Sequence, residues 1–301
     1  MENTSADSLN EKPAAAATAT EEKPKNEWKD LGVFLVKLAL IVFVVRSFIF
    51  SPFSIPSESM LPRLLIGDYL FITKWNYGYS RHSLPWSVPL IPGRIFGGTP
   101  NRGDVVVFKA PGHNGEDWIK RVIGLPGDSV QMVNGQLILN GQKIPKQQIA
   151  NFTVPISPNY PVAGPENDYH GCKTDFVKTD DKGVLVCSVP QFRETLPGGK
   201  TYGVLDQAML QQDNTPVYHV PQGHVFLMGD NRDNSTDSRF DAPPPGATPE
   251  EAAHYGISYV PLENLEGKAV VNFWSTDGSA NWFLPWTWFT AARWSRIGEG
   301  F

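Results

Sequence analysis

The feature that most constrains how this chain can fold is an apolar run from Leu31 to Phe50, LGVFLVKLALIVFVVRSFIF. Twenty helical residues span about 30 Å, which is the thickness of the hydrocarbon core of a bilayer. Its charged residues, Lys37 and Arg46, are tolerated where a long side chain can reach the membrane interface. We therefore predict one transmembrane helix over residues 31–50.

Two other interpretations of the run are weaker. A helix in a soluble core would present a polar face, and very little of this run is polar. A cleaved signal peptide would begin earlier and end at a small-residue site, whereas SFIFSPFSIPS follows here. Lysines precede the run and arginines lie at or beyond its far end (Lys23, Lys25, Lys29; Arg46, Arg63), an asymmetry that favours a cytoplasmic N-terminus.

The segments on either side of the run differ in composition. Residues 1–30 are polar and Ala-rich, which predicts a disordered tail, and their acids argue against a mitochondrial or chloroplast transit peptide. From Leu64 onward, short runs rich in Val, Ile and aromatic residues alternate with turns, in a chain with 26 prolines and 27 glycines. The Asn134-Gly135 pair is a strong hairpin signal.

These patterns predict a mainly β fold. We expect a large antiparallel-sheet domain made of residues 51–128 and 222–301, with a smaller β domain, residues 129–221, inserted into it. The aromatic-rich segment NWFLPWTWF near the C-terminus is more typical of packing or of a membrane surface than of a ligand site.

Composition excludes several functions. The net charge of -5 argues against a nucleic-acid-binding protein. There are only two cysteines, Cys172 and Cys187, and no Cys-x-x-Cys pair, so a zinc ribbon is excluded. In an oxidising compartment the two can form one disulfide.

Common hydrolase motifs are absent from the sequence, which contains no Gly-x-Ser-x-Gly, Ser-x-x-Lys or His-Glu-x-x-His. The six histidines are scattered, so a Ser-His-Asp triad stays open but unsupported. The polar loop DNRDNSTDSR, residues 230–239, resembles a calcium loop only superficially. Counted from Asp233, Ser238 stands where that loop needs Gly and Pro244 where it needs Glu. We expect a salt-bridge network there and no metal.

Lys120 lies in an apolar segment, WIKRVI, with Trp118 and Val122 on the same face of a predicted strand. Desolvation lowers the pKa of a lysine, and a neutral amine can act as a general base. This segment alone, however, favours an edge-strand lysine that reaches water.

Four motifs occur in order after the apolar run: PSESMLPRLLIGD, RGDVVVFK, DWIKRVIGLPGD and MGDNRDNSTDSR. Together they closely resemble the motif boxes of bacterial type I signal peptidases, over about residues 33–274. The resemblance implies a serine endopeptidase that uses a Ser nucleophile, a neutral Lys base and no cofactor. It also implies a bacterial inner-membrane enzyme whose catalytic domain lies on the periplasmic face.

The resemblance also assigns residues by matching motifs. Ser59 is implied as the nucleophile, Lys120 as the base, Ser57 as an oxyanion donor and Ser235 as the residue that orients the lysine. Supporting residues are Asp230, Asp237, Arg121 and Arg239. Apolar pockets for small residues before the cut site are implied at Phe53, Ile55, Met60, Leu64, Val107, Trp118 and Ile119. Trp118 stands where a tyrosine is frequent, so its larger indole narrows the pocket.

The implied partners are exported pre-proteins with Ala-x-Ala-type cleavage sites, together with membrane lipid. Three rivals stay open at this point. One is an anchored, non-catalytic β protein, which the presence of Ser59 and Lys120 disfavours. The others are a Ser-Lys protease with another role, such as a self-cleaving repressor or a spore-type signal peptidase, and an organellar homologue. Repressors carry a DNA-binding domain in place of a membrane span, and an organellar homologue needs a transit peptide.

Overall fold

The computed structural model describes residues 27–164, 170–281 and 283–301. The chain divides into two units after Val42, and each is treated by itself. The first unit holds most of helix α1, and the second holds every strand. Most of the predicted tail, residues 1–26, lies outside the described residues.

Helix α1, Glu27–Val44, continues through a π-helical turn, Val45–Ile49, directly into the first strand. It begins four residues before the predicted span, because Glu27 and Asp30 place negative charge in the first helical turn, where the helix dipole favours it. Within the described chain, residues 27–49 form the one helix that is long and apolar enough to cross a bilayer. None of the α1 residues is buried.

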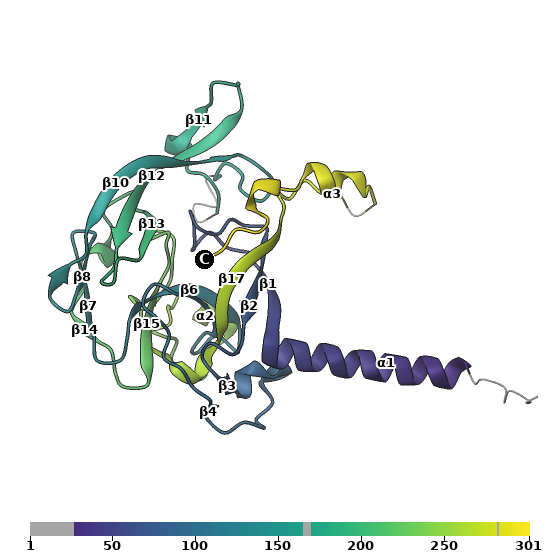
Figure 1. Cartoon of the computed structure of the whole chain (residues 1–301). Helices are drawn as coiled ribbons and strands as arrows, with labels where there is room; N and C mark the ends of the chain where they lie inside the picture. The colour runs from purple at the N-terminus through teal and green to yellow at the C-terminus, as the bar shows by residue number, and fades with distance from the viewer. Residues whose placement is uncertain (1–26, 165–169, 282) are drawn as a thin grey trace, which may run out of the picture. The chain divides into compact units, whose positions relative to one another are not determined.

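The second unit is built on a seven-stranded sheet whose neighbouring strands are all antiparallel (Figure 1). In spatial order the strands are β1 (Phe50–Ser54), β2 (Asp68–Thr73), β17 (Leu265–Ser275), β5 (Val105–Lys109), β6 (Asp117–Gly124), β15 (His224–Met228) and β16 (Val260–Pro261). The mainly β, antiparallel fold is therefore confirmed.

The strands between residues 129 and 219 form two smaller sheets. One contains β10 (Lys146–Pro155), β11 (Val177–Thr179), β12 (Leu185–Thr195) and β13 (Thr201–Leu205); the other contains β7 (Ser129–Val133), β8 (Gln136–Leu139), β9 (Gln142–Lys143) and β14 (Tyr218–His219). The β7–β8 hairpin turns at Asn134-Gly135, both with positive φ, as the sequence predicts.

The remaining elements are short. They are the β3–β4 pair (Tyr79–Ser80, Arg94–Ile95), helices α2 (Pro249–Ala252) and α3 (Trp286–Thr290), and single 3-10 turns at Arg81–Ser83, Pro85–Ser87, Thr174–Phe176, Gln211–Asp213, Leu262–Asn264 and Trp294–Arg296.

The inserted strands share a hydrophobic core with the large sheet. Ile123 and Phe226 of the large sheet pack in one buried cluster with Val130, Met132 and Leu137 of the insertion. A common core of this kind holds the two parts in direct contact. The insertion as a separate domain, residues 129–221, stays a prediction.

Gly124 ends β6 where the two parts meet. A side-chain carbon there would lie 2.9 Å from atoms of Val130, Val220 and Phe226, closer than carbon atoms pack. We predict that Gly124→Ala lowers the free energy of unfolding by about 1–3 kcal/mol through overpacking. The matched control is Gly97→Ala, whose nearest neighbour is the flexible side chain of Arg94. Equal unfolding midpoints for the two variants in denaturant titrations would contradict the shared core.

Candidate active site

Two side chains from separate elements meet in a hydrogen bond beside an interior strand of the large sheet. Ser59 lies in the turn that follows β1, and Lys120 lies in the middle of β6. The Lys120 Nζ is 2.8 Å from Ser59 Oγ and 3.2 Å from the carbonyl oxygen of Ile119. Both side chains are buried, so the amine and hydroxyl meet with little access to water.

The burial of Lys120 changes its acidity. Desolvation lowers its pKa to about 8, although the carboxylates of Asp237 and Asp230 act in the opposite direction. Its two hydrogen-bond acceptors are neutral groups, and among the described residues no carboxylate bonds directly to the amine. At moderately alkaline pH the amine is largely neutral and can accept a proton from Ser59.

Ser57 lies beside Ser59, the nucleophile that the sequence predicts. The two hydroxyl oxygens of Ser57 and Ser59 are 3.4 Å apart, so both face the same side of the segment. The backbone N–H of Ser59 donates no hydrogen bond to any residue that the structure describes. A hydroxyl and a free N–H side by side are the donors that an oxyanion requires.

Ser235 approaches the same place from the polar loop of residues 230–239. Its hydroxyl donates to Asp237 Oδ2 at 2.9 Å, and its orienting role towards Lys120 stays a prediction. The approach depends on Gly229, which the sequence analysis missed. A side-chain carbon at Gly229 would lie 2.3 Å from Ser235 Oγ and 2.5 Å from the Ser59 carbonyl oxygen.

Buried ion pairs hold the polar loop. Arg121 donates to both carboxylate oxygens of Asp230, at 2.7 and 2.6 Å, and Arg239 donates to both of Asp237, each at 2.9 Å. Burial opposes ionisation of Asp237, but Arg239 and the N–H of Gly229 keep its pKa below the usual value. The sequence predicts a salt-bridge network within the loop; of these two pairs only Arg239–Asp237 lies inside it, and Arg121 reaches Asp230 from β6.

A third buried pair extends this network into the insertion. Arg232 donates to both carboxylate oxygens of Glu194, at 3.0 and 2.6 Å, and Glu194 belongs to β12. No local sequence pattern points to Glu194, because its partner is 38 residues away and only the fold brings them together. The pair ties the polar loop to the inserted sheet.

The predicted pocket residues divide between two clusters. Phe53, Ile55, Met60, Leu64, Val107 and Ile119 lie in one hydrophobic cluster beneath the Ser59 turn. Trp118 packs against a different cluster, with its ring centroid 5.3 Å from Lys120 Nζ. Its ring also contacts the imidazole of His113, at 4.3 Å between centroids, a neighbour that the sequence gave no reason to expect.

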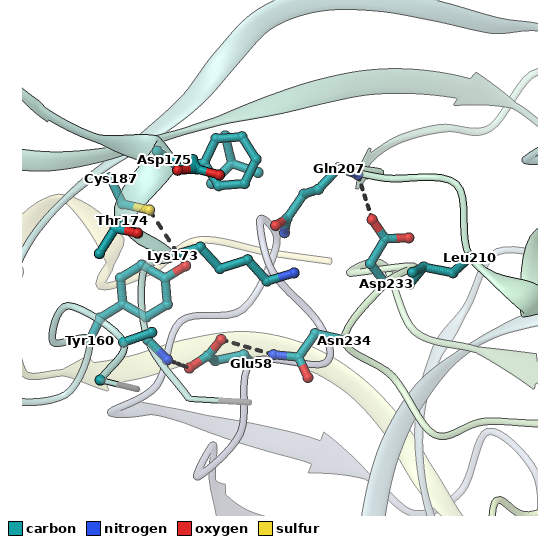
Figure 2. A pocket seen from close by; sticks show the side chains of 15 residues that line it. Glu58, Tyr160, Lys173, Thr174, Asp175, Cys187, Gln207, Leu210, Asp233 and Asn234 are labelled. Carbon is teal, nitrogen blue, oxygen red and sulfur yellow. Dashed lines mark hydrogen bonds between the residues drawn. The ribbon is translucent and has the colours of Figure 1, made fainter. Parts of the chain in front are cut away.

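A cavity of about 600 Å³ lies next to the Ser57–Ser59 segment, lined in part by Glu58 and by none of these pocket residues. Figure 2 shows Glu58 entering it, with Tyr160, Lys173 and Asn234 around it. The Cys172–Cys187 disulfide, with an S–S distance of 2.00 Å, borders the cavity through Cys187.

One group of carboxylates has the spacing of a cation site. Asp206, Asp213 and Asp233 each offer an oxygen within 4.8 Å of the others. Lys146 forms an ion pair with Asp206, so a positive charge already lies against the group. Acidic groups of this kind are common without a metal, and the absence of a metal cofactor stays a prediction.

We predict that Asp237→Asn strongly destabilises the protein. The change leaves the guanidinium of Arg239 buried without its carboxylate, at a cost of about 3–5 kcal/mol in the free energy of unfolding. The control is Asp181→Asn at an exposed position, which should change it by less than about 0.5 kcal/mol. A similarly small change for both variants, measured by denaturant unfolding, would refute the structural role of this pair.

This chain is similar to known proteins over most of its length. The model of the family described as signal peptidase, peptidase S26, matches residues 28–274. Signal peptidase I of Rickettsia akari (strain Hartford) is 32% identical over 296 residues, covering 92% of this chain and 93% of that protein. Signal peptidase I of Rickettsia rickettsii (strain Sheila Smith) is 33% identical over 266 residues, covering 85% and 82%.

A crystal structure of a signal peptidase I from Enterococcus faecalis V583 is also similar, with 22% sequence identity and a TM-score of 0.26. It covers 56% of this chain and 95% of that chain. A superposition this loose supports no conclusion about the fold or the site.

Proposed function

The chain belongs to the signal peptidase family, peptidase S26, and from that premise we propose that it is a membrane-anchored endopeptidase that removes N-terminal signal peptides from exported pre-proteins. The observation that carries the mechanism is the 2.8 Å hydrogen bond between Lys120 Nζ and Ser59 Oγ in a buried setting. A serine hydroxyl is a weak nucleophile at its own pKa and needs an adjacent base.

In the proposed reaction, neutral Lys120 takes the hydroxyl proton as Ser59 Oγ attacks the carbonyl carbon of the scissile bond. The Ser57 hydroxyl and the Ser59 N–H donate to the developing oxyanion. Lys120 then gives its proton to the leaving amine, which leaves an acyl-enzyme ester on Ser59. A water molecule, deprotonated by the same amine, hydrolyses the ester and restores the hydroxyl.

A Ser-His-Asp triad would require a histidine in contact with Ser59. Within the described chain, no histidine forms a hydrogen bond with Ser59, and the buried His113 directs its Nε2 to the carbonyl oxygen of Gly256 at 2.9 Å. A triad would need a histidine within hydrogen-bond reach of the nucleophile. The geometry therefore favours Lys120 as the base.

The proposed substrate segment lies extended along the sheet and places small side chains against the apolar cluster beneath Ser59. Little of that cluster is exposed, so we expect only small side chains to fit against it, as at Ala-x-Ala-type sites. Trp118 is half-buried beside Lys120 and forms a bulky wall on that side. Main-chain pairing with a strand would supply affinity, and the shallow walls would supply selectivity.

The proposed location is the bacterial inner membrane, with α1 as the anchor and the catalytic unit outside the cytoplasm. Ser59 lies only ten residues after the helical segment, so along the chain the proposed nucleophile is close to the membrane anchor. Several large apolar side chains of the C-terminal segment are exposed, among them Phe283, Trp286 and Phe289, as expected for contact with lipid headgroups. The net charge of -5 gives no reason to expect a nucleic-acid partner.

We predict that Ser59→Ala and Lys120→Ala each abolish cleavage of a pre-protein bearing an Ala-x-Ala site, measured with the full chain in detergent micelles. Lys120→Arg should also be inactive, because a guanidinium keeps its charge and cannot act as the base. A His113→Ala variant serves as the control and should retain activity. Cleavage by Ser59→Ala at the wild-type rate would exclude the mechanism.

The pKa of Lys120 sets the pH dependence. Because the base must be neutral, kcat/KM should rise with pH, reach half its maximum near pH 8 and stay high above that value. The measurement is a pH–rate profile with the same pre-protein. An optimum near pH 5 would show that a group other than Lys120 acts as the base.

A further inference from the structure

Glu58 stands between the two serines of the proposed site, and its side chain enters the 600 Å³ cavity described above. Ser57 and Ser59 do not line that cavity, and their hydroxyls face each other at 3.4 Å. Glu58 is therefore held on the side of the segment that faces away from the two serine hydroxyls.

The Glu58 carboxyl group bridges two loops that are far apart in the sequence (Figure 2). One oxygen, Oε1, accepts a hydrogen bond from the backbone N–H of Gly171, next to the disulfide-bonded Cys172. The other oxygen, Oε2, accepts from Asn234 Nδ2 at 3.0 Å, and Asn234 precedes Ser235 in the polar loop.

The backbone of the same segment is held by a second residue of the polar loop. The N–H of Asn231 donates to the Ser59 carbonyl oxygen at 3.0 Å, and its Nδ2 donates to the Glu58 carbonyl oxygen at 3.3 Å. The segment carrying both serines is thus fixed from behind by the polar loop and the disulfide-bonded loop. A shift of either loop would move the nucleophile relative to Lys120.

Glu58 is an unusual residue to use for this purpose, because it is 4% exposed and has no cation bonded to it among the described residues. Desolvation raises its pKa to about 7, although the hydrogen bonds from Gly171 and Asn234 lower it. The other ionisable groups that line the cavity are Tyr160, Lys173, Asp175 and Asp233. Ionisation of this buried carboxyl group lowers the free energy of unfolding. Its presence therefore points to a role other than stability.

We propose that Glu58 is a positioning residue, which holds Ser57 and Ser59 in line with Lys120 by linking the disulfide-bonded loop to the polar loop. The proposal rests on the function proposed above and adds a residue that neither the motif assignment nor the catalytic chemistry uses. A misplacement of reacting groups by about 1 Å can lower a rate by 10²-fold, so the loss of this link should reduce the rate of the chemical step.

Two variants separate the link from the charge. Glu58→Ala removes both hydrogen bonds, and we expect kcat at pH 9 to fall at least tenfold with KM within about twofold of the wild-type value. Glu58→Gln keeps an acceptor for Gly171 and nearly the same size, so its kcat should stay within about threefold of the wild-type value. The measurements use the full chain in micelles and a pre-protein substrate, with the exposed Glu250→Gln as the matched control.

Stability is measured on the same samples. The pKa of Glu58 is higher in the folded state, so the wild-type protein loses stability as pH rises from about 4.5 to about 7. Glu58→Gln has no such ionisation and should unfold at pH 8 at a temperature equal to or higher than the wild type. A kcat loss in Glu58→Ala at temperatures where all of it is folded then reflects positioning.

A double-mutant cycle completes the test. If Asn234 acts through Glu58, the Glu58→Ala/Asn234→Ala variant should have the same kcat as Glu58→Ala alone. The proposal is overturned if Glu58→Ala keeps the wild-type kcat, if its loss appears in KM alone, or if Glu58→Gln loses as much kcat as Glu58→Ala. Ser59→Ala is assayed in parallel, since cleavage by that variant would refute the proposed function itself.

Discussion

The proposed chemistry rests on the 2.8 Å contact between the Lys120 amine and the Ser59 hydroxyl. A primary amine is charged at neutral pH in water, and a charged amine cannot accept a proton. Burial in β6 lowers the pKa of Lys120 to about 8, and neutral groups occupy its hydrogen-bond positions. In the proposed mechanism, an amine whose base strength is set by desolvation takes the place that histidine has in other serine hydrolases.

The carboxylates near Lys120 must be paired with other cations if none of them is to bond to its amine. Asp230 and Asp237 both raise the pKa of Lys120, but each accepts two hydrogen bonds from the guanidinium of a buried arginine, Arg121 or Arg239. These pairs neutralise the carboxylates and fix the polar loop. The same loop contacts the Ser59 segment through Asn231 and Asn234, so hydrogen bonds link the proposed nucleophile to the loop that carries these ion pairs.

The sequence predicted the large features because they are set by local patterns. Apolar length predicts the helix, alternating β-rich runs predict the sheet, and Asn134-Gly135 predicts its hairpin. Pairings between distant segments were beyond such patterns: Arg232 with Glu194, Glu58 with Gly171, and the packing of His113 on Trp118 depend on how the chain closes. The motif resemblance named Ser59 and Lys120 as partners, whereas the WIKRVI segment alone favoured a solvent-reaching lysine. The register of β5 and β6 places Lys120 opposite Val106 inside the sheet, which no local pattern specifies.

The central claim is that burial makes the Lys120 amine a base near pH 8. It is tested most directly by NMR titration of the full chain in micelles, with ¹⁵N at the lysine side-chain amines and Lys120→Arg used to assign the signal. The account predicts that the Lys120 amine loses its proton near pH 8, below the ordinary value of a lysine amine. A Lys120 signal that titrates with those of the exposed lysines would contradict it.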